Sequence, residues 1–151
     1  MPAAVSELTD HLGYWLRIVS NHVSYAFARR LSDKDVTVAE WAMMRVLFGR
    51  GPVAPSGLAM KMGLTRGAVT KLADRLIGKG LAAREEGQKD RRTQTLRLTA
   101  RAEALVPELA AAADQNDLEW FGSLPDGERR ALERILKTMA ARLALTSIPV
   151  D

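Results

Sequence analysis

The sequence has no cysteine among its 151 residues, and aromatic residues make up only 5% of it. Without thiols there can be no disulfide framework, no thiolate-bound zinc or iron–sulfur centre and no thiol-based redox switch. The apolar stretches are also far shorter than the roughly 20 residues that a membrane span needs. Residues 1–10 lack the basic start and apolar run of a signal peptide. We therefore expect a soluble, cytoplasmic protein with no membrane partner.

Residues suited to catalysis are equally scarce. The only histidines, His11 and His22, lie on one predicted helix without a close carboxylate cluster, which argues against a metal site or a nucleophile–base pair. Residues 63–67 lack the Lys-Ser/Thr pair of a phosphate-binding loop. Glu85 and Glu86 would point to opposite faces of a strand. The sequence therefore predicts that the chain is not an enzyme and holds neither a cofactor nor a metal.

What the sequence does contain is 47% hydrophobic residues, enough for one compact domain, and an uneven distribution of charge. The net charge is +1 over residues 1–51, +6 over residues 52–100 and −3 over residues 101–151. A basic middle between neutral and acidic ends favours a polyanion-facing module held by a scaffold. The alternative interpretation is a basic face that is simply solvated.

Apolar spacing and capping residues predict four helices in the first half of the chain. Apolar residues recur every three or four positions from Leu8 to Leu31, which is the pattern of one long helix. Thr37 and Glu40 form a capping box that opens a second helix running to about Arg50. A third helix begins at Pro55–Ser56 and ends at Gly63. Of the methionines, four are expected in or near the core: Met43, Met44, Met60 and Met62.

Thr65 is placed to cap the fourth helix, and Gly80 is placed to end it. The apolar face of this helix consists of Val69, Leu72, Ala73 and Leu76. Only residues 63–65 separate it from the third helix, so the pair fits a helix-turn-helix whose second helix is presented outward.

The second half of the sequence predicts a hairpin followed by two helices. Residues 81–86 and 95–99 read as strands on either side of a charged loop at residues 87–93. Thr99 can cap a long helix that runs toward Trp120, and Pro125 begins a last helix that reaches Leu143. The predicted fold class is therefore mainly α with a small β-hairpin, in a single domain over residues 1–151.

Two parts of the basic middle suit DNA. On the fourth helix, the side opposite the apolar face is small, polar and basic, as a helix in a major groove requires. The residues on or near that side are Gly67, Thr70, Lys71, Asp74 and Arg75. The hairpin tip crowds three cations, whose mutual repulsion a polyanion would relieve, and such a tip can enter a minor groove. Each feature alone also fits an ordinary solvated surface. The residues at the tip are Lys89, Asp90, Arg91 and Arg92.

The sequence resembles the MarR family of bacterial winged-helix transcriptional regulators from about Leu8 to Leu143. The resemblance rests on three stretches, of which the third is the most specific. They are VTVAEW at residues 36–41, GLTRGAVTKLADRL at residues 63–76, and Gly80-Leu81 leading to Asp90-Arg91-Arg92 and Leu96-Arg97-Leu98-Thr99.

The resemblance implies a winged helix-turn-helix with N- and C-terminal dimerisation helices. Residues 36–100 would bind DNA, and residues 6–31 and 101–146 would form the dimer scaffold. It makes the fourth helix the recognition helix and Arg92, braced by Asp90, the minor-groove residue of the wing. Together with the charge pattern, it predicts these DNA contacts: Ser56, Thr65, Arg66, Gly67, Thr70, Lys71, Arg75, Lys89, Asp90, Arg91 and Arg92.

The terminal helices independently favour a homodimer. They carry more apolar surface than a small winged-helix core can cover, for example Leu8, Leu12 and Trp15 at one end and Met139 and Leu143 at the other. An intrachain helical pair is the alternative. A symmetric dimer predicts a pseudo-palindromic site in duplex DNA, with half-sites about 34 Å apart.

The resemblance also implies a small aromatic or amphipathic effector that releases DNA. Candidate effector residues are Tyr14, Trp15 and His22 on the first helix and Trp41 and Arg45 on the second, although packing explains both tryptophans better. The absence of cysteine excludes the thiol-sensing branch of the family. The predicted function is a sequence-specific DNA-binding regulator, namely a repressor relieved by an effector. The alternative is a non-specific architectural or protein-docking winged-helix protein.

Overall fold

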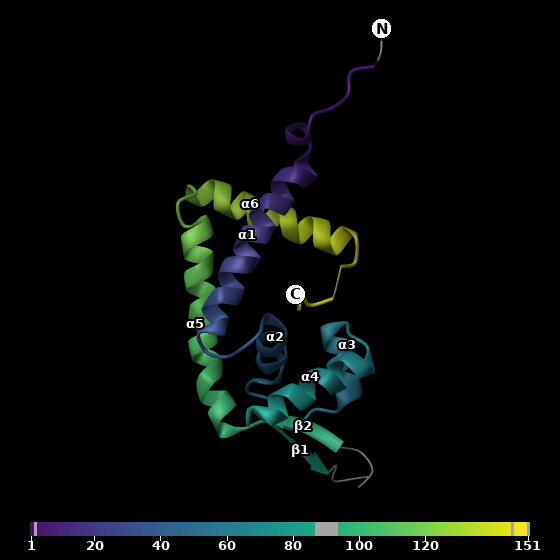
Figure 1. Cartoon of the computed structure of the whole chain (residues 1–151), viewed down its shortest axis with the longest axis vertical. Helices are drawn as coiled ribbons and strands as arrows, with labels where there is room; N and C mark the ends of the chain where they lie inside the picture. The colour runs from purple at the N-terminus through teal and green to yellow at the C-terminus, as the bar shows by residue number, and fades with distance from the viewer. Residues whose placement is uncertain (2, 87–93, 146, 151) are drawn as a thin grey trace.

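The computed structural model describes residues 1, 3–86, 94–145 and 147–150, and Figure 1 shows a small winged helix attached to a scaffold of long helices. Over these residues, no helix is both long enough and apolar enough to cross a membrane. The predicted fold class, mainly α with a two-stranded hairpin, is confirmed. The elements in chain order are η1 (Leu8–Asp10), α1 (Leu12–Ser32), α2 (Val38–Leu47), α3 (Pro55–Met62), α4 (Arg66–Gly78), β1 (Ala82–Glu86), β2 (Gln94–Leu98), α5 (Ala100–Phe121) and α6 (Asp126–Arg142).

Three threonines cap helices as the sequence predicts, because each side-chain oxygen satisfies a backbone N–H that has no partner within its helix. The Thr65 hydroxyl accepts a hydrogen bond from the Ala68 N–H at 3.1 Å, which starts α4. Thr99 starts α5 in the same way. At α2, Thr37 and Glu40 make both hydrogen bonds of the capping box.

Several helix boundaries differ from the prediction. The first helix is interrupted at His11, whose extended backbone (φ −101°, ψ 126°) separates the 3₁₀ turn η1 from α1. Helix α2 ends at Leu47, before Arg50, because Phe48 is also extended. Helix α4 ends at Gly78, and Gly80 (φ 72°) then turns the chain into the hairpin. Apolar spacing marks these helices correctly, but the backbone angles of single residues decide where they end.

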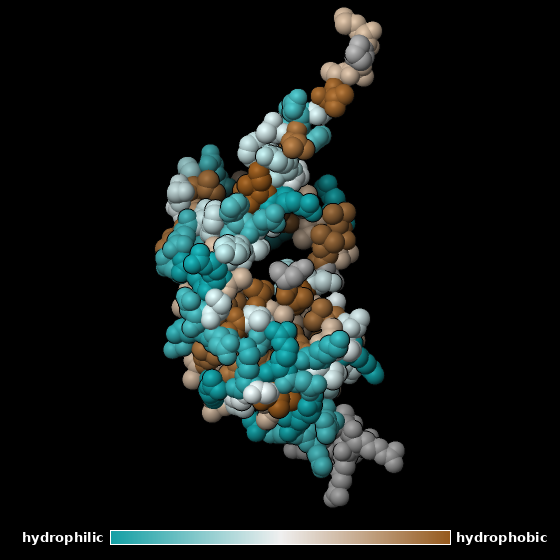
Figure 2. Space-filling model, viewed as in Figure 1, coloured by the Kyte–Doolittle hydropathy of each residue, from teal (hydrophilic) through white to brown (hydrophobic). Residues whose placement is uncertain are grey.

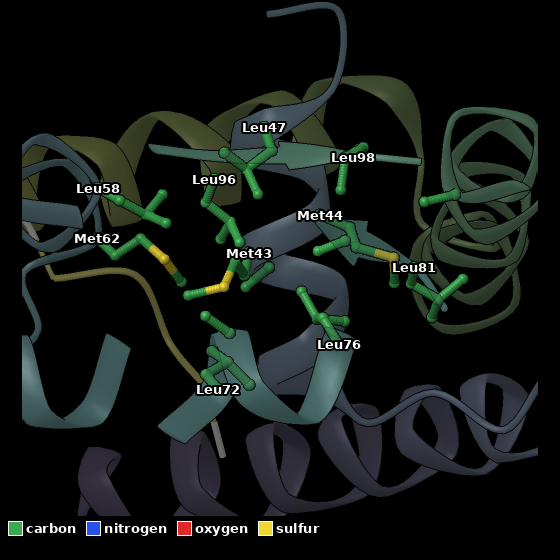
Figure 3. Packing of buried hydrophobic residues seen from close by; sticks show 14 of the residues in the cluster. Met43, Met44, Leu47, Leu58, Met62, Leu72, Leu76, Leu81, Leu96 and Leu98 are labelled. Carbon is green, nitrogen blue, oxygen red and sulfur yellow. The ribbon is translucent and has the colours of Figure 1, made fainter. Parts of the chain in front are cut away.

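The hydrophobic core lies between α2, the two short helices α3 and α4, the hairpin and the start of α5. Figure 3 shows Met43 and Met44 of α2 at its centre, facing leucines from the surrounding elements. The prediction for Met60 is wrong, because this side chain is 85% exposed on the face of α3 opposite Leu58 and Met62. The core therefore contains three of the four predicted methionines: Met43, Met44 and Met62.

The hairpin is antiparallel, with Ala82 opposite Leu98 and Glu86 opposite Gln94. Val53, in the loop before α3, exchanges two backbone hydrogen bonds with Leu96, at 2.9 and 2.8 Å. This bridge attaches β2 to the helix-turn-helix, so the hairpin and the two short helices form one unit.

The scaffold helices leave much apolar surface exposed. Helix α1 runs beside α5, and α6 crosses near the far end of α1 in Figure 1. None of the residues of α6 is buried. Figure 2 shows apolar atoms along the N-terminal segment, which extends beyond the rest of the molecule. The exposed apolar side chains on these helices include Leu8, Leu12, Trp15, Leu16 and Val19, and Ile135, Leu136, Met139 and Leu143.

The C-terminal segment returns to the winged helix, which the sequence analysis does not predict. The Ile148 N–H donates to the Met62 carbonyl at 3.1 Å, and Ile148 and Val150 pack against the core. Gly63, which ends α3 with φ 66°, lies under this segment: a Cβ there would be 2.8 Å from the Ser147 Cα. Both the left-handed backbone and the close approach therefore require glycine at this position.

We expect Gly63→Ala to lower the free energy of unfolding by more than about 1 kcal/mol, because alanine disfavours positive φ and its Cβ would displace Ser147. Urea denaturation measures this change. Gly67→Ala is the matched control, because open space surrounds Gly67 inside α4; it should be neutral or slightly stabilising. Equal effects of the two substitutions would show that position 63 carries no special constraint.

Candidate nucleic-acid interface

Helix α4 has one buried face and one exposed basic face. Val69, Leu72, Ala73 and Leu76 are buried, at the spacing of one helical face. The opposite face must then point to solvent. The side chains exposed there include Arg66, Gly67, Thr70, Lys71 and Arg75, and the neighbouring Ser56 and Thr65 are exposed as well. Of the predicted DNA contacts that the structure describes, those of α4 are exposed on the side of the helix away from the core, and Ser56 and Thr65 are exposed at the starts of α3 and α4.

The hydroxyl groups of Thr65 and Thr70 already have intrachain partners. Thr65 accepts from the Ala68 N–H, and the Thr70 hydroxyl donates to the Arg66 carbonyl at 3.0 Å. A hydroxyl oxygen has two lone pairs, so Thr70 can still accept a hydrogen bond from a base edge. Ser56 is the second residue of α3, where backbone N–H groups and the helix dipole favour an anion such as a phosphate.

Two acidic side chains near this surface are paired with arginines. Asp74 of α4 contacts Arg84 of β1 at 2.5 Å, and Glu85 pairs with Arg97 across the hairpin. The first pair joins α4 to the hairpin and the second joins the two strands of the hairpin. Both pairs reduce the repulsion that these carboxylates would exert on a polyanion.

A buried carboxylate connects the start of α2 to α4. Glu40 is fully buried, and its Oε1 accepts from the Thr37 N–H at 3.0 Å. Arg75 Nη2 lies 3.3 Å from Glu40 Oε1, and Lys79 Nζ lies 3.0 Å from Glu40 Oε2. Lys79 also donates to the Asp35 carbonyl at 2.7 Å. The spacing of Thr37 and Glu40 in the sequence predicts the capping role of Glu40. It does not predict the ion pairs, because Arg75 and Lys79 lie 35 and 39 positions away along the chain.

The pKa of Glu40 reflects two opposing effects. Burial acts to raise the pKa of this carboxyl above its ordinary value of 4.5, but hydrogen bonds from Lys79 and Thr37 outweigh burial, so the pKa is lowered. A carboxyl with a lowered pKa stabilises the fold above its unfolded-state pKa. That stabilisation is lost as the pH falls through the folded-state value.

The predicted wing-tip residues Lys89, Asp90, Arg91 and Arg92 lie outside the described residues. The strands on either side of them are β1 and β2, which follow α4 directly. Their assignment as DNA contacts stays a prediction.

Two of the predicted effector residues line a cavity of about 390 Å³ between α1 and α2. Trp41 contributes its indole, which meets Phe27 edge to face, and Arg45 contributes a charged group. Tyr14 and Trp15 instead pack against each other farther along α1, and His22 lies against Trp120. The remaining lining residues are Ser24, Phe27, Val38, Ala42, Val46, Ile148 and Pro149.

A buried polar side chain that sequence reasoning missed lies beside this cavity. Asn116 of α5 is 2% exposed, and its amide nitrogen donates to the Val23 carbonyl at 3.2 Å. Among the described residues, no donor reaches its Oδ1. Asn116 lines a smaller cavity of about 190 Å³ that shares Ser24, Phe27 and Trp41 with the first. An asparagine in the alanine-rich stretch of α5 was the only sequence signal.

Comparison of the sequence with known protein families finds a match to the MarR family. The model of the MarR family matches residues 36–93. A protein of Thauera aromatica, named as a transcriptional regulatory protein for the hcr operon, is 27% identical over 133 residues, which is 87% of this chain and 80% of that protein. The relatives are named as regulators, in agreement with the prediction that the chain is not an enzyme.

Solved structures share the fold. BpsR of Bordetella bronchiseptica, whose DNA binding is regulated by 6-hydroxynicotinic acid, matches with a TM-score of 0.77 at 24% identity, over 91% of this chain and 98% of that one. A variant of MarR from E. coli in complex with operator DNA matches with a TM-score of 0.74 at 24% identity, over 85% and 92% of the two chains. At these identities the likeness establishes the winged-helix architecture.

We expect Glu40→Gln to lower the free energy of unfolding by about 1–3 kcal/mol at pH 7, because Lys79 and Arg75 lose a buried charged partner while the amide can keep the Thr37 hydrogen bond. The difference from the unmodified chain should shrink as the pH falls through the lowered folded-state pKa of Glu40, where its carboxyl becomes protonated. Denaturant unfolding across this pH range measures both effects. Glu133→Gln, on an exposed pair with Lys137, is the control and should change stability little; a deficit of Glu40→Gln that is independent of pH would contradict the assignment.

Proposed function

We propose that this chain, whose residues 36–93 match the model of the MarR family, is a transcriptional regulator that binds a pseudo-palindromic duplex with α4 in the major groove. The observation that carries this proposal is the exposed basic face of α4, which presents Arg66, Gly67, Thr70 and Lys71 to one side. A small residue permits close approach of the backbone, hydroxyls reach base edges, and cations neutralise phosphates. In this proposal the wing, through Arg92, reads the minor groove.

We propose further that two copies of the chain associate through residues 6–31 and 101–146, while residues 36–100 bind DNA. The exposed apolar side chains of α1 and α6 support this division, since α6 has no buried residue within the single chain. Covering such surface against a second copy removes it from water. A two-fold dimer would place two α4 helices about one turn of DNA apart, roughly 34 Å.

The finer proposal is that the chain represses transcription by occupying its operator and is released by a small aromatic acid. The cavity beside Trp41 supports this ligand class, because it is mainly apolar and Arg45 can bind a carboxylate. Ile148 lines the cavity, and its backbone N–H donates a hydrogen bond to the carbonyl of Met62 at the end of α3. Ligand binding there would therefore alter a contact of the helix-turn-helix.

Lys71→Ala tests the DNA contact. If Lys71 neutralises a phosphate, its loss should weaken binding to all duplexes and reduce the slope of log K against log salt by about one. Fluorescence anisotropy titrations at several salt concentrations measure the slope. Lys137→Ala on α6 removes the same charge far from α4 and should leave the slope unchanged, whereas equal slopes for both variants would make Lys71 an ordinary surface residue.

Selection of bound fragments from sheared genomic DNA separates the two interpretations of DNA binding. A specific regulator should prefer its recovered site over random duplex by roughly 10³ or more at physiological salt. An architectural protein would bind both alike, and a protein-docking module would retain no duplex even at low salt.

Benzoate is a suitable probe for the cavity. We expect it to raise the melting temperature, with the rise growing with the logarithm of concentration. Arg45→Met should weaken this binding by about tenfold or more, since the carboxylate loses a charged hydrogen bond. Arg50→Met removes a similar charge from an exposed position that does not line the cavity. A benzoate response that Arg45→Met leaves intact would place the ligand elsewhere.

A further inference from the structure

The most unusual charged group in the chain is the carboxylate of Glu40. A capping glutamate needs only one oxygen for its backbone hydrogen bond and is normally half in solvent, yet this side chain is fully buried. Burying a carboxylate is unfavourable unless cations and donors surround it. One of the two cations that surround it, Arg75, lies on the helix proposed to enter DNA, and the other, Lys79, is the C-cap residue of that helix.

The contacts connect successive turns of α4 to one point on α2. Arg75 lies in the last turn of α4, and Lys79, four residues on, is its C-cap residue with a helical backbone, so both side chains project from the same side. Arg75 Nη2 donates to Thr37 Oγ1 at 3.1 Å and to Glu40 Oε1 at 3.3 Å. Lys79 Nζ contacts Glu40 and the Asp35 carbonyl. The position of α4 along and around its axis is therefore fixed by charge as well as by its apolar face.

Arg75 is only partly used by these contacts. Half of its side-chain surface is exposed, and within the described part of the chain its hydrogen bonds all run through Nη2. A guanidinium carries five N–H groups in a rigid plane. When one edge of that plane is held by Glu40 and Thr37, the orientation of the other edge is set before any ligand arrives.

We propose that Glu40 is a positioning residue for DNA binding: it holds Arg75 so that the outer edge of the guanidinium meets a backbone phosphate. This inference rests on the proposed function. Its physical basis is pre-organisation, because a long side chain that is already ordered loses less conformational freedom when it binds.

The effect of Glu40→Gln on DNA affinity has opposite signs under the two possible roles. Neutralising a carboxylate near a polyanion should strengthen binding, or leave it unchanged, if Glu40 matters only for its charge or for stability. Loss of positioning should weaken binding despite the added net positive charge. The sign of the change is therefore the informative quantity.

Fluorescence anisotropy titrations measure the affinity of each variant for the duplex that binds most tightly in the genomic selection. The temperature is one at which circular dichroism shows that every variant is folded. We expect Glu40→Gln to weaken binding about 3- to 10-fold and Arg75→Ala about 10-fold or more. In the Arg75→Ala background, Glu40→Gln should change affinity less than twofold, because Glu40 acts through Arg75. Glu86→Gln, which neutralises an exposed carboxylate of β1, should leave affinity unchanged or raise it.

Equal or tighter binding by folded Glu40→Gln would overturn the positioning role while leaving the proposed function intact. An undiminished effect in the Arg75→Ala background would also overturn it. If Glu40→Gln does not fold, Arg75→Lys is the variant to measure instead. A single ammonium group cannot hold both Glu40 and a phosphate, as the planar guanidinium does. Arg75→Lys should therefore lose most of the affinity that Arg75→Ala loses. Affinity retained by Arg75→Lys would contradict positioning, and failure of the unmodified chain to bind any duplex would overturn both proposals.

Discussion

The structure depends on the burial of one ten-residue helix. Helix α2 packs against α1 and α5 on the scaffold side and against α3, α4 and β2 on the other. Met43, Met44 and Leu47 are almost completely buried within it, and their flexible or branched side chains fill the space that these elements leave. Because α2 contacts both halves, a change in its position would move the scaffold relative to the proposed DNA-binding face.

Helix α2 also concentrates the polar features that matter for function. Its first turn carries Glu40, which binds Arg75 of α4 and Lys79 just after that helix. Its outer side carries Trp41 and Arg45, which line the cavity of about 390 Å³. The proposed ligand site and the proposed positioning of the recognition helix are therefore on the same short element. Such an arrangement permits coupling between two sites, since a packed helix moves as a unit.

Much of the fold could be predicted from the sequence because the relevant signals are local. Thr37, Thr65 and Thr99 start helices through hydrogen bonds that span three residues, so their spacing is visible in the chain itself. Boundaries were less predictable: the extended backbone of His11 and Phe48 ends regular structure where apolar spacing continues. Met60 was misplaced because a short helix gives too few turns to define its buried face.

The sequence by itself determined the order of the elements, the capping of the helices and which face of α4 is basic, because each of these depends on residues three or four positions apart. Only the tertiary structure decided the partners of the charged and buried groups. The ion pairs of Glu40 join residues 35 and 39 positions apart, Asn116 reaches the Val23 carbonyl, and Ile148 returns to Met62. Such contacts form between segments that meet only when the chain has folded, and no periodicity in the sequence records them.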